Sequence, residues 1–195
     1  MLKPRGFTIV ELVVVMTIMA ILLTLGVVSL NASQVNARNL ERDADIEAIA
    51  KGLEARYARG NAYAVAPSFI NKGAYPSVLE FQHAQGTLVA SITPTQTAMY
   101  LDQILTGTQV SSFLPPGAQE NADIKTTFKP VCITACAAGV AATINTAING
   151  SNNVYVYEPV SADGNVCVNT ECIRYNLYYL PEGASVYKTK ESLRQ

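Results

Sequence analysis

The chain has 195 residues, of which 49% are hydrophobic and only 15% are charged, so we expect one globular domain in a membrane-associated protein. Much of the apolar content lies near the N-terminus rather than being spread evenly along the chain. The formal net charge is -1, which gives no basic field, so charge argues against a nucleic-acid partner and none is expected.

The first predicted element is an apolar helix over residues 7–30, a run of 24 residues with a single charge. At about 1.5 Å per residue this helix would be about 36 Å long, which is enough to cross a hydrocarbon core of about 30 Å. Lys3 and Arg5 precede the run, so the positive-inside rule places residues 1–6 in the cytoplasm and the body outside. We therefore expect a single-pass helix in the cytoplasmic membrane.

Glu11 is the one charge inside this run. A charged side chain within an apolar membrane helix costs about 2.5–3.5 kcal/mol on insertion scales, and such a residue usually has a partner. In the alternative, Glu11 lies near the membrane interface of an ordinary anchor and stays solvated. The composition of the run alone leaves both interpretations open.

Residues 6–12, with the sequence GFTIVEL, resemble the leader junction of type IV pilin and pseudopilin precursors. The short basic leader, the Gly before the Phe, the Glu four residues later and the long apolar helix all come in the order found in that family. The resemblance covers residues 1–60 closely. It implies that a prepilin peptidase cuts between Gly6 and Phe7, that residues 1–6 are a leader, and that the new amine of Phe7 is N-methylated.

The same resemblance implies a role for Glu11, which would pair with the Phe7 amine of a neighbouring subunit during assembly. Each charge is costly alone in an apolar bundle, and the two compensate each other. The implied function is that of a structural subunit of an extracellular type IV pilus, which serves adhesion, twitching motility or DNA uptake. Such a subunit is not an enzyme and needs no cofactor. Its partners would be further copies of itself in a helical homopolymer, the prepilin peptidase, and the pilus assembly platform with its ATPase.

An alternative from the same family is a pseudopilin of a type II-like secretion machine, or a minor pilin that acts in filament initiation. Many pilins carry a helix-breaking Pro within the apolar helix, whereas Val27 and Val28 occupy that neighbourhood here. This departure is compatible with a minor pilin or a pseudopilin. A membrane-anchored enzyme is disfavoured, because no nucleophile elbow, phosphate loop or zinc-protease motif is present.

Beyond Leu30 the helix is predicted to continue over residues 31–60 as an amphipathic segment. Its apolar residues keep helical spacing at Ile46, Ile49, Ala50, Leu53 and Tyr57. Gly60 is a natural stop. This half of the helix should therefore pack its apolar stripe against a sheet.

Residues 61–195 are predicted to form a globular head. A short helix is expected over residues 97–105, and residues 118–153 carry no clear pattern. Strands are predicted at residues 153–157 from their aromatic and β-branched content, at residues 172–180 from their alternation, and at residues 184–188. The expected fold class is α+β, a long N-terminal helix packed on a C-terminal antiparallel sheet, as in the pilin fold.

Four cysteines, Cys132, Cys136, Cys167 and Cys172, lie in the part of the chain expected outside the cytoplasm. An even number in an oxidising compartment predicts disulfides. Their spacings differ from the common C-x2-C pattern of zinc sites, and no metal is expected. Three connectivities are possible, of which the local pairs Cys132–Cys136 and Cys167–Cys172 are preferred but not decided.

Overall fold

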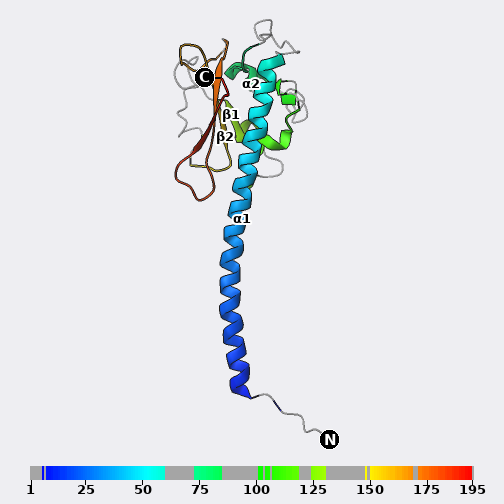
Figure 1. Cartoon of the computed structure of the whole chain (residues 1–195), viewed down its shortest axis with the longest axis vertical. Coiled ribbons are helices and arrows are strands. Elements are labelled where there is room, and N and C mark those ends of the chain that lie inside the picture. The colour runs from blue at the N-terminus through cyan, green and yellow to red at the C-terminus, as the bar shows by residue number, and fades with distance from the viewer. Residues whose placement is uncertain are drawn as a thin grey trace. The chain divides into compact units, whose positions relative to one another are not determined.

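The computed structural model describes Gly6 and residues 8–59, 73–84, 101–102, 104–105, 107–118, 124–130, 148, 150–168 and 171–194. The chain divides into two compact units, Met1–Ala37 and Arg38–Gln195. Helix α1, Ile9–Arg59, begins in the first unit and ends in the second (Figure 1). Every other helix and strand that the structure describes belongs to the second unit, which we call the head.

Helix α1 spans 51 residues and confirms the prediction of one long helix. No proline interrupts it, and its only two glycines are Gly26 and Gly52. Its chemistry changes along its length: the part before Leu30 is apolar, and charged residues become frequent only from Arg38 onward. Within the head, α1 buries the predicted apolar stripe, with Ile46, Ile49, Ala50 and Leu53 all in the core.

The sheet has four strands in the order β1-β2-β3-β4. They are β1 (Phe128–Pro130), β2 (Tyr155–Val160), β3 (Arg174–Tyr179) and β4 (Lys188–Glu191). The last three strands pair antiparallel, as predicted. However, β1 pairs parallel to β2, so the sheet is mixed and the prediction of a wholly antiparallel sheet is wrong for this pairing. β1 is three residues long and ends in a proline, so it shows no alternation by which a sequence pattern would reveal it.

The third C-terminal strand lies further along the chain than predicted. It was expected at residues 184–188, but β4 begins only at Lys188. Gly183 has a φ of 80°, and the Ala184 N–H donates to the Pro181 carbonyl at 3.1 Å, so a turn occupies the start of the expected strand. The sequence of β4, KTKE, contains no apolar residue, and its pairing with β3 could therefore not be read from hydrophobic alternation.

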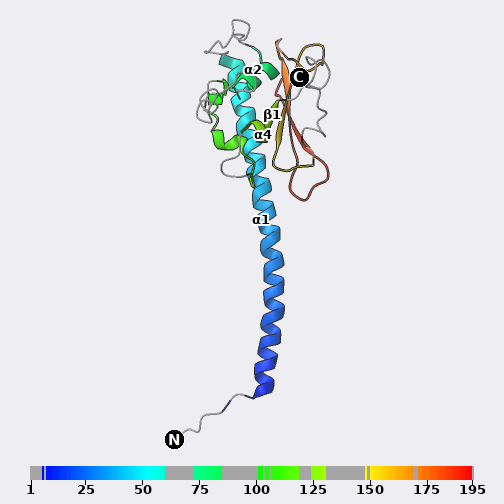
Figure 2. The ribbon, with the colours of Figure 1, turned by 180° about the vertical axis from the view of Figure 1, so that it is seen from behind.

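The core of the head is rich in aromatic side chains. Three short helices border it: α2 (Val78–Ala84), η2 (Val110–Phe113) and α4 (Ile124–Thr127). The Phe81 ring lies 4.8 Å from the Tyr157 ring, and the Phe113 ring lies 5.0 Å from the Phe128 ring, both edge to face. Such pairs contribute about 0.5–1.5 kcal/mol beyond the area they bury. The end of α1 lies beside the sheet in both views of the head (Figure 2).

Carboxylates on α1 accept hydrogen bonds from tyrosines of the sheet. The Tyr155 hydroxyl donates to Asp45 at 2.9 Å, and the Tyr179 hydroxyl donates to Asp43. Glu54 accepts from the hydroxyl of Tyr175 on β3 at 3.3 Å and from the hydroxyl of Tyr75, which precedes α2, at 2.9 Å. Burial raises the pKa of Tyr155 well above its ordinary value, so the phenol remains a proton donor. These bonds fix the rotation of α1 about its own axis against the sheet.

Candidate functional site

The most unusual surface of the molecule is the N-terminal part of α1. Every large hydrophobic side chain that the structure describes between Ile9 and Leu30 is exposed. Within the described residues, α1 is the one helix long and apolar enough to cross a membrane, and none of its apolar window is buried. A contiguous apolar surface of this length marks contact with lipid or with other protein surfaces. We call Ile9–Leu30 the apolar segment.

Glu11 lies in the first turn of the apolar segment, where Thr8 caps the helix. The Glu11 N–H donates to the Thr8 hydroxyl oxygen at 3.2 Å, and that hydroxyl lies 3.5 Å from the Glu11 carboxylate. The spacing T-x-x-E is the capping-box pattern, a signal that was present in the sequence and was overlooked. A carboxylate in the first turn also interacts favourably with the helix dipole. Glu11 is exposed, and no ion pair engages it among the described residues.

The predicted cleavage junction is only partly described. Gly6 is exposed, and a Cβ atom added to it would meet no atom within 4 Å. The chain itself therefore imposes no steric need for glycine at this position, and any such need must come from a partner that binds the junction. Phe7 and residues 1–5 lie outside the described residues, so cleavage and N-methylation at Phe7 stay predictions.

Two threonine hydroxyls within the apolar segment are satisfied by the helix itself. The Thr17 hydroxyl donates to the Val13 carbonyl at 2.8 Å, and the Thr24 hydroxyl donates to the Ile21 carbonyl at 2.8 Å. A hydroxyl paired in this way loses little on entering a medium without water. Glu11 is the one charged residue of the apolar segment, and its carboxylate still requires a partner there.

Within the head, Arg42 ties α1 to two loops. Its side chain is only 1% exposed, yet it lies on the charged half of the helix. The guanidinium donates to the Pro116 carbonyl at 2.8 Å, to the Asn152 carbonyl at 3.1 Å and to the Asn39 amide oxygen at 3.1 Å. Several hydrogen bonds compensate a buried cation that would otherwise be costly. This role of Arg42 was not predicted.

A bidentate ion pair lies next to Arg42. The Arg38 Nε and Nη2 atoms each donate to the Glu182 carboxylate at 2.6 Å, and the Glu182 N–H donates to the Asn39 side-chain oxygen at 2.8 Å. The hydrogen bond from Arg38 lowers the pKa of the Glu182 carboxyl. The loop before β4 is thus fastened to the first turn of α1 that belongs to the head.

The carboxyl group of Asp45, on the part of α1 within the head, has a raised pKa. Burial raises its pKa from 3.8 to about 6, and the hydrogen bond from Tyr155 only partly opposes this effect. Nearby Glu41 raises the pKa further, while Arg42 lowers it. Asp45 thus titrates in a mildly acidic range, although its environment is that of a packing contact rather than a cleft.

Cys167 and Cys172 form a disulfide, the local pairing that the sequence analysis preferred. The disulfide closes the loop between β2 and β3. The backbone of Cys172 also forms an isolated antiparallel β-bridge with Tyr75, just before α2. Cys132 and Cys136 lie outside the described residues, so their pairing stays a prediction. No group of three potential metal-ligating side chains occurs in the part of the chain that the structure describes.

Residues 1–27 match the family model described as the prokaryotic N-terminal methylation motif. This motif is the prepilin signature of type IV pilins and pseudopilins, so the resemblance found in the sequence is confirmed for the N-terminal segment. No curated protein and no solved structure matches the chain. The match ends within the apolar segment and does not reach the head.

Proposed function

We propose that this chain, which carries the prepilin signature at its N-terminus, is a structural subunit of an extracellular type IV pilus filament. One observation carries the proposal: the signature leads directly into an apolar segment whose described side chains are all exposed and which contains a single charge, at Glu11. A membrane accounts for the apolar surface of a precursor. It does not by itself account for a carboxylate held at the start of the helix.

Assembly moves the apolar segment from lipid into a bundle of identical helices. Because lipid tails are as apolar as the helix surface, close packing rather than the hydrophobic effect drives such association. Polar groups then decide the register between neighbouring helices. Thr17 and Thr24 contribute little to register, since their hydroxyls already bond to their own helix. Glu11, as the one charged group of the segment, would then select one alignment.

The partner of Glu11 in this proposal is the Phe7 amine of a neighbouring copy. Hydrolysis of the Gly6–Phe7 amide would release residues 1–6 and convert an uncharged amide into an ammonium group. N-methylation keeps that positive charge. Glu11 and the amine would then neutralise each other inside the bundle, where each would be strongly destabilising alone. Assembly thereby depends on cleavage, because an uncut chain has no cation at residue 7.

The head supports this role through its hold on α1. A filament subunit must withstand tension between its helix and its outer domain. Arg42 and the Arg38–Glu182 ion pair connect α1 to three loops of the head that lie far away in sequence. The buried stripe around Ile49 and Leu53 adds apolar contact along the next three turns. We propose no catalytic activity for the head.

Mass spectrometry of filaments sheared from cells tests the proposal. We expect a chain that begins at N-methylated Phe7, and for Gly6→Asp we expect an uncut precursor that stays in the membrane fraction. A chain that still begins at Met1 in wild-type cells, and is found only in membranes, would refute the proposal. A chain cut at Phe7 but absent from sheared filaments would instead favour the secretion pseudopilin or the minor pilin.

A further inference from the structure

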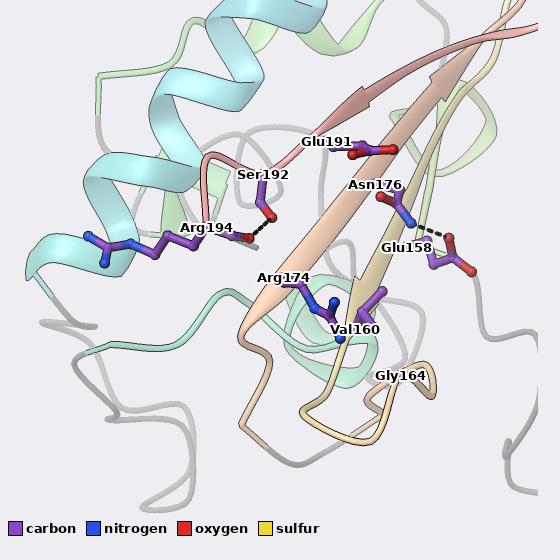
Figure 3. A pocket seen from close by; sticks show the side chains of 8 residues that line it. All are labelled: Glu158, Val160, Gly164, Arg174, Asn176, Glu191, Ser192 and Arg194. Atoms are coloured by element: carbon purple, nitrogen blue, oxygen red, sulfur yellow. Dashed lines mark hydrogen bonds between the residues drawn. The ribbon is translucent and has the colours of Figure 1, made fainter.

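A polar hollow of about 470 Å³ lies on the sheet face that points away from α1 (Figure 3). Side chains alternate along β2 and β3, so Tyr155, Tyr157 and Tyr175 face α1, whereas Glu158 and Asn176 face the hollow. The β2–β3 loop and the chain after β4 close its sides. A volume of this size falls within the range of small-molecule sites, about 300–1,000 Å³.

Two carboxylates and an amide form one row across the hollow. Glu158 pairs with Asn176 in the ladder between β2 and β3, and Asn176 pairs with Glu191 in the next ladder. Glu158 is only 9% exposed, and one of its oxygens accepts hydrogen bonds from the Tyr178 hydroxyl at 2.5 Å and from Asn176 at 2.9 Å. This carboxylate is held in place by the sheet, while Glu191 is exposed beside it.

The cation of the hollow is Arg174, which lies two residues before Asn176 on the same face of β3. Its Nε is buried and donates no hydrogen bond, and the guanidinium forms no ion pair with either glutamate in the described structure. The other lining arginine, Arg194, points its guanidinium away and stacks it over the Tyr57 ring at 4.2 Å. The hollow thus keeps one positive and two negative side chains apart instead of neutralising them against each other.

A guanidinium fork matches a carboxylate, and the Arg174 guanidinium has no ion-pair partner among the described residues. A ligand carboxylate in the hollow could therefore pair with the nitrogens of Arg174 that line it. The two glutamates would repel a phosphate or another dianion, and they favour a ligand that also carries a positive group. Two carboxylates are too few for a metal cage, which agrees with the absence of a three-residue ligand group among the described residues.

We propose that this hollow binds a small zwitterion of the peptide class, whose carboxylate pairs with Arg174 and whose ammonium group pairs with Glu158 and Glu191. The Asn176 amide, placed between the two glutamates, would hydrogen-bond to the peptide group. The site does not depend on polymerisation, since all of its residues belong to the head. It would give the outer face of the sheet a ligand-binding role separate from that of the apolar segment.

Saturation-transfer NMR with the full chain in detergent tests this proposal, using the dipeptide alanyl-alanine as the probe. Its N-acetyl form and its C-terminal amide each remove one of the two charges, and galacturonate serves as a carboxylate without an ammonium group. We expect alanyl-alanine to bind and each modified dipeptide to bind at least tenfold more weakly. Arg174→Gln should weaken binding at least tenfold, whereas Lys51→Gln, on exposed α1 surface, should not change it.

Three results would overturn the proposal. The first is the absence of transfer to alanyl-alanine. The second is binding of the acetylated and amidated dipeptides that is as tight as that of alanyl-alanine. The third is tighter binding of galacturonate, which would make the hollow a site for acidic sugars. Glu191→Gln provides a check that does not depend on Arg174, and the fold should tolerate it because the residue is exposed. This substitution should weaken the binding of alanyl-alanine without weakening the binding of its N-acetyl form.

Discussion

The two halves of α1 belong to one continuous helix but differ in their surroundings. In the apolar segment, Ile9–Leu30, leucines and valines are exposed, whereas in Arg38–Arg59 even an arginine is buried. Hydrophobicity alone therefore does not decide which residues a chain buries within itself. Burial in the second half follows from a sheet and three loops that cover the helix, and the first half has no such cover within its own unit. The apolar segment is therefore a surface suited to contact with lipid or with other protein surfaces.

Among substitutions that test this difference between the two halves, we expect the largest effect at Glu11. Loss of one member of a buried ion pair is destabilising by about 3–5 kcal/mol, so Glu11→Ala should reduce sheared filaments at least tenfold. The precursor should still insert into the membrane, and its head should unfold at the wild-type temperature. Thr24→Ala is the control, because the Thr24 hydroxyl bonds only within its own helix. Normal piliation of Glu11→Ala would refute the pairing with Phe7.

A matched pair of leucines measures the difference between the halves directly. Leu53 is 0% exposed and Leu23 is 70% exposed on the same helix. Leu53→Ala should lower the free energy of unfolding of the head by about 2–5 kcal/mol, whereas Leu23→Ala should change it by less than about 0.5 kcal/mol. Near-ultraviolet circular dichroism suits the measurement, since the chain has no tryptophan and all of its tyrosines follow Arg56. If the two substitutions changed the free energy of unfolding equally, Leu53 and Leu23 could not differ in burial as described.

The two glycines of α1 offer a second matched pair. A Cβ atom at Gly52 would overlap the Thr108 hydroxyl and lie 3.4 Å from the Leu105 Cβ, whereas a Cβ atom at Gly26 meets nothing within 4 Å. Gly52→Ala should therefore destabilise the head by about 1–3 kcal/mol through overpacking. Gly26→Ala should leave the head unchanged and favour the helix by about 0.5–1 kcal/mol. A Gly52→Ala head as stable as wild type would show that the neighbouring loop adapts without cost.

The smallest expected effect is a pH dependence that arises from Asp45. Its pKa is raised to about 6 in the folded head, so the folded state binds this proton more tightly than the unfolded chain does. This carboxyl should therefore lower stability as the pH rises from about 4 to about 6. Glu182 has the opposite sign, because its lowered pKa gives stability that is lost on acidification. The difference between wild type and Asp45→Asn isolates the first contribution, and identical pH profiles would rule it out.

Much of this architecture was predictable because its signals are local. The apolar run, the single charge and the spacing of Ile46, Ile49 and Leu53 each involve neighbours along one helix. The capping box of Thr8 and Glu11 was equally local and could have been found. The prepilin junction was recognised from the short basic leader, residues 6–12 and the long apolar run, but its chemistry depends on a second copy and on a peptidase.

What sequence reasoning missed depends on contacts between distant residues. Strand β4 contains only polar residues, and besides its ladder with β3, Lys188 and Lys190 reach carboxylates on α1, at 3.2 and 2.8 Å. Arg42 looked like an ordinary surface cation, since the carbonyls that bury it lie 74 and 110 residues away in sequence. The hollow around Arg174 likewise exists because strand pairing brings Glu158, Asn176 and Glu191 together.

The fastening of α1 by the end of the chain has a consequence for biogenesis. Arg38 finds Glu182 across a separation of 144 residues, and Asp43 finds Lys188 across 145. Contacts of such high sequence separation form late, after the cost of closing a long loop has been met. In the precursor that we propose, the helix would be made first, and Asp43 and Glu47 would meet Lys188 and Lys190 only when the last strand had crossed the membrane. The head would thus be complete only at the end of that step, and a chain halted before Lys188 would leave the edge of β3 without the strand that pairs with it.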